Sequence, residues 1–395
     1  MIDDRVARHN TLVLAVAQSL GGASPPIVVS LGGIVGAALA PDKSLATVPV
    51  SLLQLGIALG TFPAAYVMRR FGRRSGYVLG GLIGVMAGTT AATGIALGSF
   101  LGFCLGTLMA GFYASYVQSY RFAATDSASP PFRPRAISWV MAGGLAAGVI
   151  GPQTVIWTRE LIPAALFAGS FLAQAALALL TIPVVSFLRP APVAADAPRS
   201  AGRPLSEIVR QPRFVVAVAA GVVSFALMSF LMTAAPMAMV ECGHSIGTAA
   251  LGIQWHVLAM FGPSFLTPRL MERYGRIPVT AAGLVLIAGA AAAGLSGLTV
   301  ANFWLALILL GLGWNFAFIG ATTLVTECYR PEERAKVQAV NDFLVFGAVA
   351  AASFSSGQLL SAGGWERVNL LVFPPVVLVL GLILWQSRRP APAAA

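Results

Sequence analysis

The stretch VMRRFGRRSG at 67–76 places four arginines and two glycines between two long apolar runs. A similar stretch, LMERYGRIPV at 270–279, separates two apolar runs in the second part of the chain. Setting GTFPAAYVMRRFGRR (60–74) against PSFLTPRLMERYGRI (263–277) aligns Phe62 with Phe265, Met68 with Met271, Arg70 with Arg273, Gly72 with Gly275 and Arg73 with Arg276. Self-similarity of this kind is the signature of an internal repeat. The sequence therefore predicts a chain built from two matching halves.

Apolar residues dominate the chain: 57% of its 395 residues are hydrophobic and only 10% are charged. A soluble domain carries about 25% charged residues, so we expect a membrane protein. Runs of about 20 apolar residues recur, each long enough to cross roughly 30 Å of hydrocarbon. Because the runs are continuous rather than alternating, they predict helices and not a β-barrel. Twelve spans are predicted, at 10–35, 45–68, 76–97, 99–120, 136–157, 162–188, 213–236, 248–268, 278–297, 301–325, 336–360 and 368–386.

The net charge of +11 reflects membrane topology and not a nucleic-acid partner. If the N-terminus lies inside, all but three of the 25 Lys and Arg residues fall in segments on that same side; the exceptions are Lys43, Arg159 and Arg367. An excess of Lys and Arg in short loops marks the cytoplasmic side. We therefore expect a multi-pass protein of the inner membrane, surrounded by lipid, with both termini in the cytoplasm.

The division of the chain follows from one long polar segment. The stretch RPAPVAADAPRSAGRPLSEIVRQPR at 189–213 is rich in Pro, Ala and Arg and is about twice the length of any other predicted loop. It predicts an N-terminal six-helix bundle at 1–188, a cytoplasmic linker at 189–212 and a C-terminal six-helix bundle at 213–395. Three widely spaced cysteines make neither a disulfide framework nor a metal motif. No phosphate-binding loop occurs, so we expect no cofactor, no bound metal and no enzymatic activity.

The duplicated hinge resembles the loop signature of the major facilitator superfamily, roughly G-x-x-x-D-R-x-G-R-R. With twelve spans and a long central loop, the resemblance covers the whole chain. It implies an all-α fold of two pseudo-symmetric six-helix bundles, a monomer, and secondary transport by rocker-switch alternating access. Arg69 occupies the acidic position of the family's hinge, whereas the second copy keeps an acid there, Glu272. The gate and hinge residues implied are Arg69, Arg70, Gly72, Arg73, Glu272, Arg273, Gly275, Arg276, Arg135 and Arg334.

Because Arg69 stands where the family has an acid, the hinge charges allow two interpretations. In one, the pairing across the halves is inverted: Arg69 or Arg70 meets Glu332 or Glu333, and Glu272 meets Arg133 or Arg135. In the other, these are solvated charges that set topology, since exposed ion pairs contribute only about 0–1 kcal/mol.

Candidate substrate contacts are aromatic and weakly polar. In GTLMAGFYASYVQSYRF, Tyr113 and Tyr116 lie on one helix face. The corresponding span of the second half carries GLGWNFAF, with Trp314 and Asn315. In the family, helices 1, 4, 7 and 10 line the central cavity, which adds Gln18 and predicts that an aromatic solute binds there. Gln254 and His256, in GIQWHVLAMFGP, are further candidates. The alternative for the aromatic residues is helix packing.

Two residues are candidates for proton coupling. Asp342, in AKVQAVNDFLVFG, lies eight residues beyond Arg334, about 12 Å into its helix. A charged group at membrane depth is a functional candidate by default. His256 is the second candidate, because histidine titrates near physiological pH. The alternatives are a gate-side carboxylate paired with a loop arginine, and a histidine that only makes a structural hydrogen bond.

The helix-5 stretch GGLAAGVIGPQ at 143–153 bears on the direction of transport. Gly148, Gly151 and Pro152 resemble a glycine-proline motif of exporters in the family, although the spacing differs. We expect a secondary transporter of a small organic solute, driven by protons. Multidrug-type efflux and transport of a planar metabolite such as riboflavin both remain open. A non-transporting receptor or sensor is the alternative from another class.

Overall fold

A computed structural model describes residues 4–129, 131–189 and 202–387. The first part of the chain forms α1 (Arg5–Gly21), α2 (Ser24–Leu39), α3 (Val48–Ala96), α4 (Phe100–Gln118), α5 (Tyr120–Ala123), α6 (Arg133–Thr158) and α7 (Ala168–Ser186). The second part forms α8 (Leu205–Val209), α9 (Pro212–Glu241), α10 (Ile246–Phe261), α11 (Thr267–Tyr274), α12 (Arg276–Leu295), α13 (Val300–Thr326), α14 (Arg334–Leu370) and α15 (Phe373–Ser387). Short 3-10 turns lie at Lys43–Leu45, Gly262–Phe265 and Pro331–Glu333.

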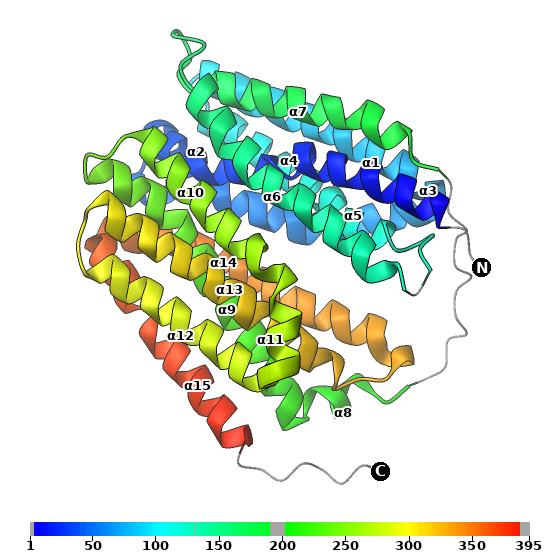
Figure 1. The fold of residues 1–395 in the computed structure, drawn as a ribbon. Coiled ribbons are helices and arrows are strands. Elements are labelled where there is room, and N and C mark those ends of the chain that lie inside the picture. The colour runs from blue at the N-terminus through cyan, green and yellow to red at the C-terminus, as the bar shows by residue number, and fades with distance from the viewer. Residues whose placement is uncertain (1–3, 130, 190–201, 388–395) are drawn as a thin grey trace.

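These helices account for twelve membrane crossings. Nine helical stretches among the described residues are long and apolar enough to span a membrane, and α10 with α11 makes a tenth, bent by 54°. Two of the nine, Lys43–Ala96 and Lys336–Gln386, hold 54 and 51 residues. At 1.5 Å per residue each exceeds about 75 Å, so each crosses a ~30 Å core twice. The chain turns back within each of them (Figure 1), which confirms the predicted twelve-helix fold.

The two hinge glycines adopt the same unusual backbone conformation. Gly72 has φ 83° and ψ 161°, and Gly275 has φ 91° and ψ 157°. Side chains rarely tolerate this region, whereas glycine enters it freely. No atom of the described residues lies close to the place where a Cβ of Gly72 would be, so the backbone turn and not crowding requires glycine. The internal repeat predicted from the sequence is therefore present in the backbone.

The eighth predicted span, at 248–268, differs from the structure, because it is broken into α10 and α11; we call this interruption the helix-8 break. α10 ends at Phe261, a 3-10 turn follows at Gly262–Phe265, and α11 continues to Tyr274. Pro263 has no N–H to donate and its ring obstructs the preceding turn. The break lies nearly two thirds of the way along the combined element, after the 16 residues of α10 and before the 8 residues of α11, and it creates backbone groups that need partners.

The two halves lie side by side in Figure 1, with the first half coloured blue to green and the second green to red. Hydrogen bonds between the halves lie far from the glycine hinges. Ser51 donates to Ser353 Oγ at 3.2 Å, and Gln153 Nε2 donates to Gln254 Oε1 at 2.9 Å. We call this region the distal end, and the region of Gly72 and Gly275 the hinge end.

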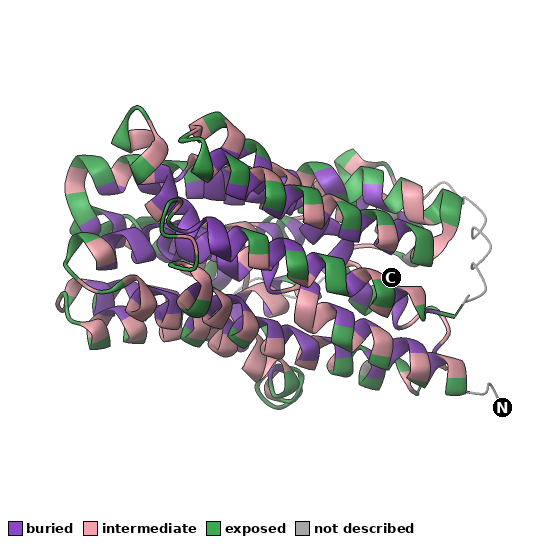
Figure 2. Ribbon diagram, turned by 90° about the horizontal axis from the view of Figure 1, so that it is seen from above, coloured by how far each residue is buried: buried purple, intermediate pink, exposed green. Residues whose placement is uncertain are grey.

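Large apolar side chains cover the outer surface of the bundle. Leu101, Trp157 and Val377 are 79%, 75% and 67% exposed. Figure 2 shows buried residues along the inward sides of the helices and exposed residues on their outer sides. This distribution is that of a protein whose surrounding solvent is lipid.

The predicted domain limits of 1–188, 189–212 and 213–395 remain a prediction, because most of the linker lies outside the described residues. Its described end contains α8, whose Ile208 is fully buried. Ile208 packs with Phe214, Val325 and Val337. This end of the linker is therefore fixed to the second half.

Candidate functional site

The helix-4 tyrosines lie inside the first half. Tyr113 is 1% exposed, and its hydroxyl makes a 3.2 Å hydrogen bond with Thr181 Oγ1 on α7. A Cβ added at Gly84 on α3 would meet the Tyr113 ring at 2.7 Å. Tyr116 is 3% exposed and packs in the same way against Gly80. Both tyrosines therefore pack between helices, which is the alternative to a contact with the substrate.

Trp314 has a different environment in the second half. Its ring stacks on Phe318, one turn along α13, at 5.1 Å between centroids and an interplanar angle of 17°. Phe225 on α9 meets both rings edge-on, at 5.3 Å and 4.9 Å. Phe261 on α10 and Phe346 on α14 complete the group, at 6.4 Å from Trp314 and 6.0 Å from Phe225. We call these five residues the aromatic cluster.

The four phenylalanines of the aromatic cluster were not predicted from the sequence. Each is only partly buried, unlike the tyrosines of the first half. Trp314 is 8% exposed, and its buried indole Nε1 has no hydrogen-bond partner among the described residues. Buried donors are nearly always paired in folded proteins, so this one is an exception that needs an explanation.

Asn315, the neighbour of Trp314, points instead into the protein and holds the broken helix. Its amide Nδ2 donates to Met260 O and Ser264 Oγ, both at 2.7 Å. Its Oδ1 accepts a hydrogen bond from Thr267 Oγ1 at 2.5 Å. Asn315 thereby satisfies groups on both sides of the helix-8 break and ties α13 to it. Its side chain is fully buried.

The other predicted contacts are dispersed. His256 is fully buried, and its Nδ1 lies 2.8 Å from Leu307 O. Gln254 accepts the hydrogen bond from Gln153 that joins the halves at the distal end. Gln18 lies partly buried beside α6, where a Cβ at Gly143 would meet its Cβ at 3.1 Å. Among the described residues, no side-chain hydrogen bond joins any of these three residues to Trp314.

The glycines at 148 and 151, in the fifth predicted span, lie on α6 and permit close contact between helices. A Cβ at Gly148 would lie 2.6 Å from Val257 of α10, in the other half. A Cβ at Gly151 would lie 2.8 Å from Pro26 of α2. Pro152 lies inside α6. The motif therefore shapes the surface where α6 meets α10 and α2.

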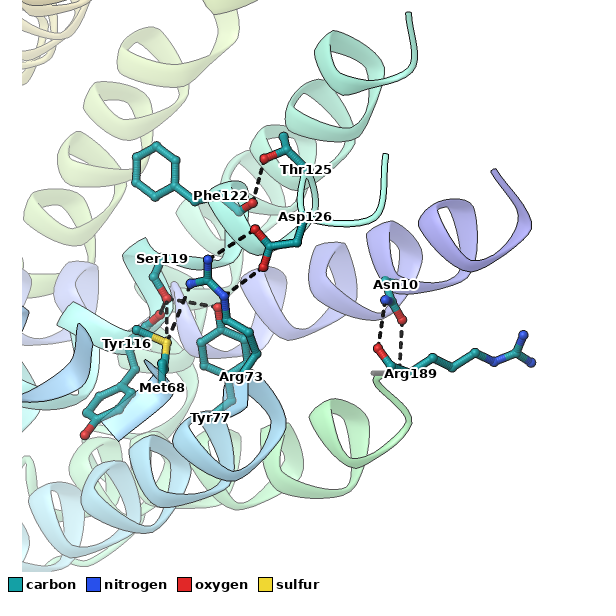
Figure 3. A network of polar contacts seen from close by, with 10 residues as sticks. All are labelled: Asn10, Met68, Arg73, Tyr77, Tyr116, Ser119, Phe122, Thr125, Asp126 and Arg189. Atoms are coloured by element: carbon teal, nitrogen blue, oxygen red, sulfur yellow. Dashed lines mark hydrogen bonds and ion pairs between the residues drawn. The ribbon is translucent and has the colours of Figure 1, made fainter. Parts of the chain in front are cut away.

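Each hinge carries an arginine that pairs with an acid at the end of a following helix. Arg73 Nε donates to Asp126 Oδ2 at 2.9 Å, beside Met68 and the Tyr77–Ser119 hydrogen bond (Figure 3). Arg276 forms the equivalent ion pair with Glu327. The sequence predicts both arginines at the hinge, but not these partners. A signal for the partners is present in the sequence, since Asp126 and Glu327 end equivalent helices.

The remaining gate residues make no described pair across the halves. Arg69, Arg70, Arg135, Glu272 and Arg273 are exposed, with the Arg273 guanidinium 5.2 Å from the centre of its neighbour's ring. The side chain of Arg334 lies outside the described part of the chain. The inverted pairing between the halves therefore remains a prediction.

Glu333, one candidate of that inverted pairing, binds the linker instead. Arg203 Nη2 donates to Glu333 Oε2 at 2.8 Å, and Arg203 Nε and N both donate to Oε1. These hydrogen bonds, with one from the Arg330 N–H, lower the pKa of Glu333 to about 2 against the effect of its burial. Because the ordinary value is 4.5, the carboxylate is charged and its anchorage complete at neutral pH; the anchorage weakens only as pH falls from 4.5 towards 2.

Asp342 lies on the exposed side of α14, near the hinge end. Its Oδ1 accepts a hydrogen bond from Asn341 at 3.2 Å. Its charge also interacts with that of Arg121 on α5, in the other half. Among the described residues, no group of three or more His, Cys, Asp or Glu side chains is placed to hold a metal ion.

Twelve crossings in two matching halves, joined at one end, define a membrane transporter of the duplicated-bundle class. The chain matches the sequence profile of the Major Facilitator Superfamily over residues 10–353 and 264–395, and it belongs to this family.

Individual relatives agree with this assignment. The riboflavin transporter RfnT of Brucella anthropi is 60% identical over 396 residues, covering 100% of both chains. The uncharacterized MFS-type transporter YddS of Bacillus subtilis is 26% identical, over 95% of this chain and 90% of its own. The crystal structure of the nucleoside transporter NupG superposes with a TM-score of 0.70 at 15% identity, over 98% of this chain and 100% of that chain.

Proposed function

We propose that this protein transports riboflavin across the inner membrane. The observation that carries the proposal is the 60% identity to a riboflavin transporter over the full length of both chains. The aromatic cluster supports it, because a flat, largely uncharged ring system binds well against aromatic faces. The substrate is therefore taken to be the planar metabolite and not a broad range of drugs.

Transport would occur by rocker-switch alternating access. Duplicated bundles of this kind place their site between the halves near the bilayer midplane and rock about it. The hydrogen bonds from Ser51 to Ser353 and from Gln153 to Gln254 join the halves at the distal end. These neutral contacts can break and re-form without desolvating a charge. The conformation described is thus proposed to be the one closed at the distal end.

Proton coupling would involve Asp342. This carboxylate faces the charge of Arg121 from the opposite half, so protonation removes an attraction between the halves. His256 is a weaker candidate, because its ring is fully buried and already bonded to Leu307 O. Asp342→Asn is expected to abolish the response of riboflavin flux to a pH gradient, while exchange of riboflavin without a gradient continues.

The test is riboflavin flux in a bacterial strain that can neither make nor import riboflavin. Expression of the protein is expected to restore growth on low riboflavin and accumulation of radiolabelled riboflavin. Export would show instead as faster loss from preloaded cells. An unchanged flux in both directions, with the protein present in the membrane, would refute the proposal. Resistance to unrelated toxic compounds would point to multidrug efflux, and binding without flux to a receptor.

A further inference from the structure

We propose that the aromatic cluster, formed by Phe225, Phe261, Trp314, Phe318 and Phe346, is the seat of the substrate's ring system. We further propose that the free indole N–H of Trp314 donates to a ring carbonyl. The inference rests on the proposed function for the identity of the ligand. Beyond that function, it specifies which half of the protein binds the ring system of the substrate and which protein atom donates a hydrogen bond to it.

The first argument is depth. Trp314 lies 12 residues before the end of α13, Phe346 lies 12 residues after the start of α14, and Phe225 lies 13 residues after the start of α9. At 1.5 Å per residue these distances are about 18–20 Å from the hinge end of three helices. The hydrocarbon core is about 30 Å thick. Helices that are far apart in the sequence thus bring their aromatic side chains to one level near the middle of the membrane.

The second argument is partial burial. The rings of Trp314 and Phe318 are nearly parallel, at 17°, and stack on one another, which leaves the outer face of the pair for a further ring. The phenylalanines around them are only partly buried, so each keeps some ring surface open. The helices α9, α10 and α14 that carry three of them also contact the first half at its helices α2, α6 and α3. Three of the helices that carry the cluster are therefore the helices through which the second half meets the first.

The third argument is the unpaired donor. The Nε1 of Trp314 is buried and has no partner in the part of the chain that the structure describes. Two other tryptophans are satisfied: the partly buried Trp304 donates its Nε1 hydrogen to Thr248 O, and the buried Trp365 donates its own to Gly294 O, both at 3.1 Å. Leaving a buried donor unpaired costs about 1–3 kcal/mol. A ligand that presents a carbonyl oxygen at this position would remove that cost.

A flavin matches both features. Its isoalloxazine ring is planar and tricyclic, and it carries two carbonyl oxygens on one edge. The ring can stack on the aromatic surface while a carbonyl accepts the indole proton. Asn315 acts here as a positioning residue, because its three hydrogen bonds to the helix-8 break fix the rotation of α13 and so the direction of Trp314.

The test measures flavin binding to purified protein in detergent by quenching of flavin fluorescence. Trp314→Phe keeps an aromatic ring but removes the N–H together with the pyrrole part of the indole; loss of the hydrogen bond alone is expected to weaken riboflavin binding about 3- to 10-fold, the value of one net hydrogen bond. Trp314→Ala also removes the stacking surface, which corresponds to about 10- to 100-fold or more. The matched control is Trp304→Phe on the same helix, whose N–H bonds a carbonyl; riboflavin affinity is expected to stay unchanged.

Lumiflavin, which keeps the tricyclic ring and lacks the ribityl chain, separates ring recognition from the rest. It is expected to bind the wild type and to lose affinity in Trp314→Phe by the same factor as riboflavin. Wild-type affinity for riboflavin in both folded Trp314 variants would overturn the ring site and leave riboflavin transport standing. Absence of any flavin binding or flux in the wild type would overturn the proposed function and this inference with it. Thermal melting of each variant identifies losses that come only from unfolding.

Discussion

The aromatic side chains of α4 and of α13 occupy equivalent helices of the two halves, yet their surroundings differ. On α4, Tyr113 is enclosed between helices and its hydroxyl bonds Thr181. On α13, Trp314 lies in a group of partly buried rings, and none of the residues that the structure describes pairs with its N–H. Internal duplication has therefore preserved the backbone arrangement and not the use of the side chains. In the first half Tyr113 packs between helices, and in the second the rings form the site that we propose for the substrate's ring system.

The largest expected change in stability comes from replacing a phenylalanine by alanine, once in each half. Phe103 on α4 is fully buried and meets Phe171 edge-on at 5.1 Å, so Phe103→Ala is expected to lower stability by about 3–5 kcal/mol. Phe225→Ala removes a partly buried ring and is expected to lower stability less. Riboflavin affinity should respond in the opposite order, with a loss only in Phe225→Ala. Thermal unfolding and fluorescence titration of both variants measure the two quantities.

The comparison fails if the two variants behave alike. Equal loss of stability with unchanged affinity would show that Phe225 is a packing residue like Phe103. Equal loss of affinity would show that the first half also contacts the ring.

Asn315→Ala is expected to have the next largest effect. It removes the hydrogen bonds that Asn315 makes to Met260 O, Ser264 and Thr267 at the helix-8 break, and a buried group left unpaired costs about 1–3 kcal/mol. Because these hydrogen bonds fix the rotation of α13 and so the direction of Trp314, riboflavin affinity is expected to fall as well. Asn302→Ala, in the capping box at the start of the same helix, is the control and should leave affinity intact. An Asn315 variant with reduced stability and full affinity would separate the break from the ring site.

Much of this arrangement could be predicted from the sequence, and the reasons are physical. Hydropathy reveals helices of about 20 residues because lipid demands them, and the glycines at 72 and 275 mark a conformation that other residues resist. The phenylalanines of the aromatic cluster could not be found in this way. In an apolar span, a phenylalanine that faces a site and one that faces lipid have the same hydropathy.

The direction of a polar side chain was equally hard to predict. Asn315 follows Trp314 directly, and successive residues on a helix point about 100° apart. The family resemblance implied that both residues line a cavity, whereas the amide of Asn315 points to the helix-8 break between α10 and α11. That break itself depends on Pro263, and a single proline within a long apolar run does not by itself distinguish a kinked helix from a broken one.

Tyr113→Phe tests the packing role in the first half and has a smaller expected effect. It removes only the hydroxyl bonded to Thr181, which corresponds to about 0.5–1.5 kcal/mol of stability. Riboflavin affinity is expected to equal that of the wild type. A clear loss of affinity without loss of stability would return Tyr113 to the substrate site and make the two halves more alike than their burial indicates.

The smallest expected effects are those of the hinge ion pairs, where the halves should behave alike. Arg73–Asp126 and Arg276–Glu327 are both partly exposed, and such pairs contribute about 0–1 kcal/mol. Double-mutant cycles on each pair, read by thermal unfolding, are expected to give small and similar coupling energies. A large coupling in one half only would mean that the duplication has diverged at its hinge as well as on its aromatic faces. Similar coupling energies in the two halves would mean that the backbone turn and its ion pair have been kept together. A turn that requires glycine fixes the backbone direction, and this direction determines which acid the following arginine can reach.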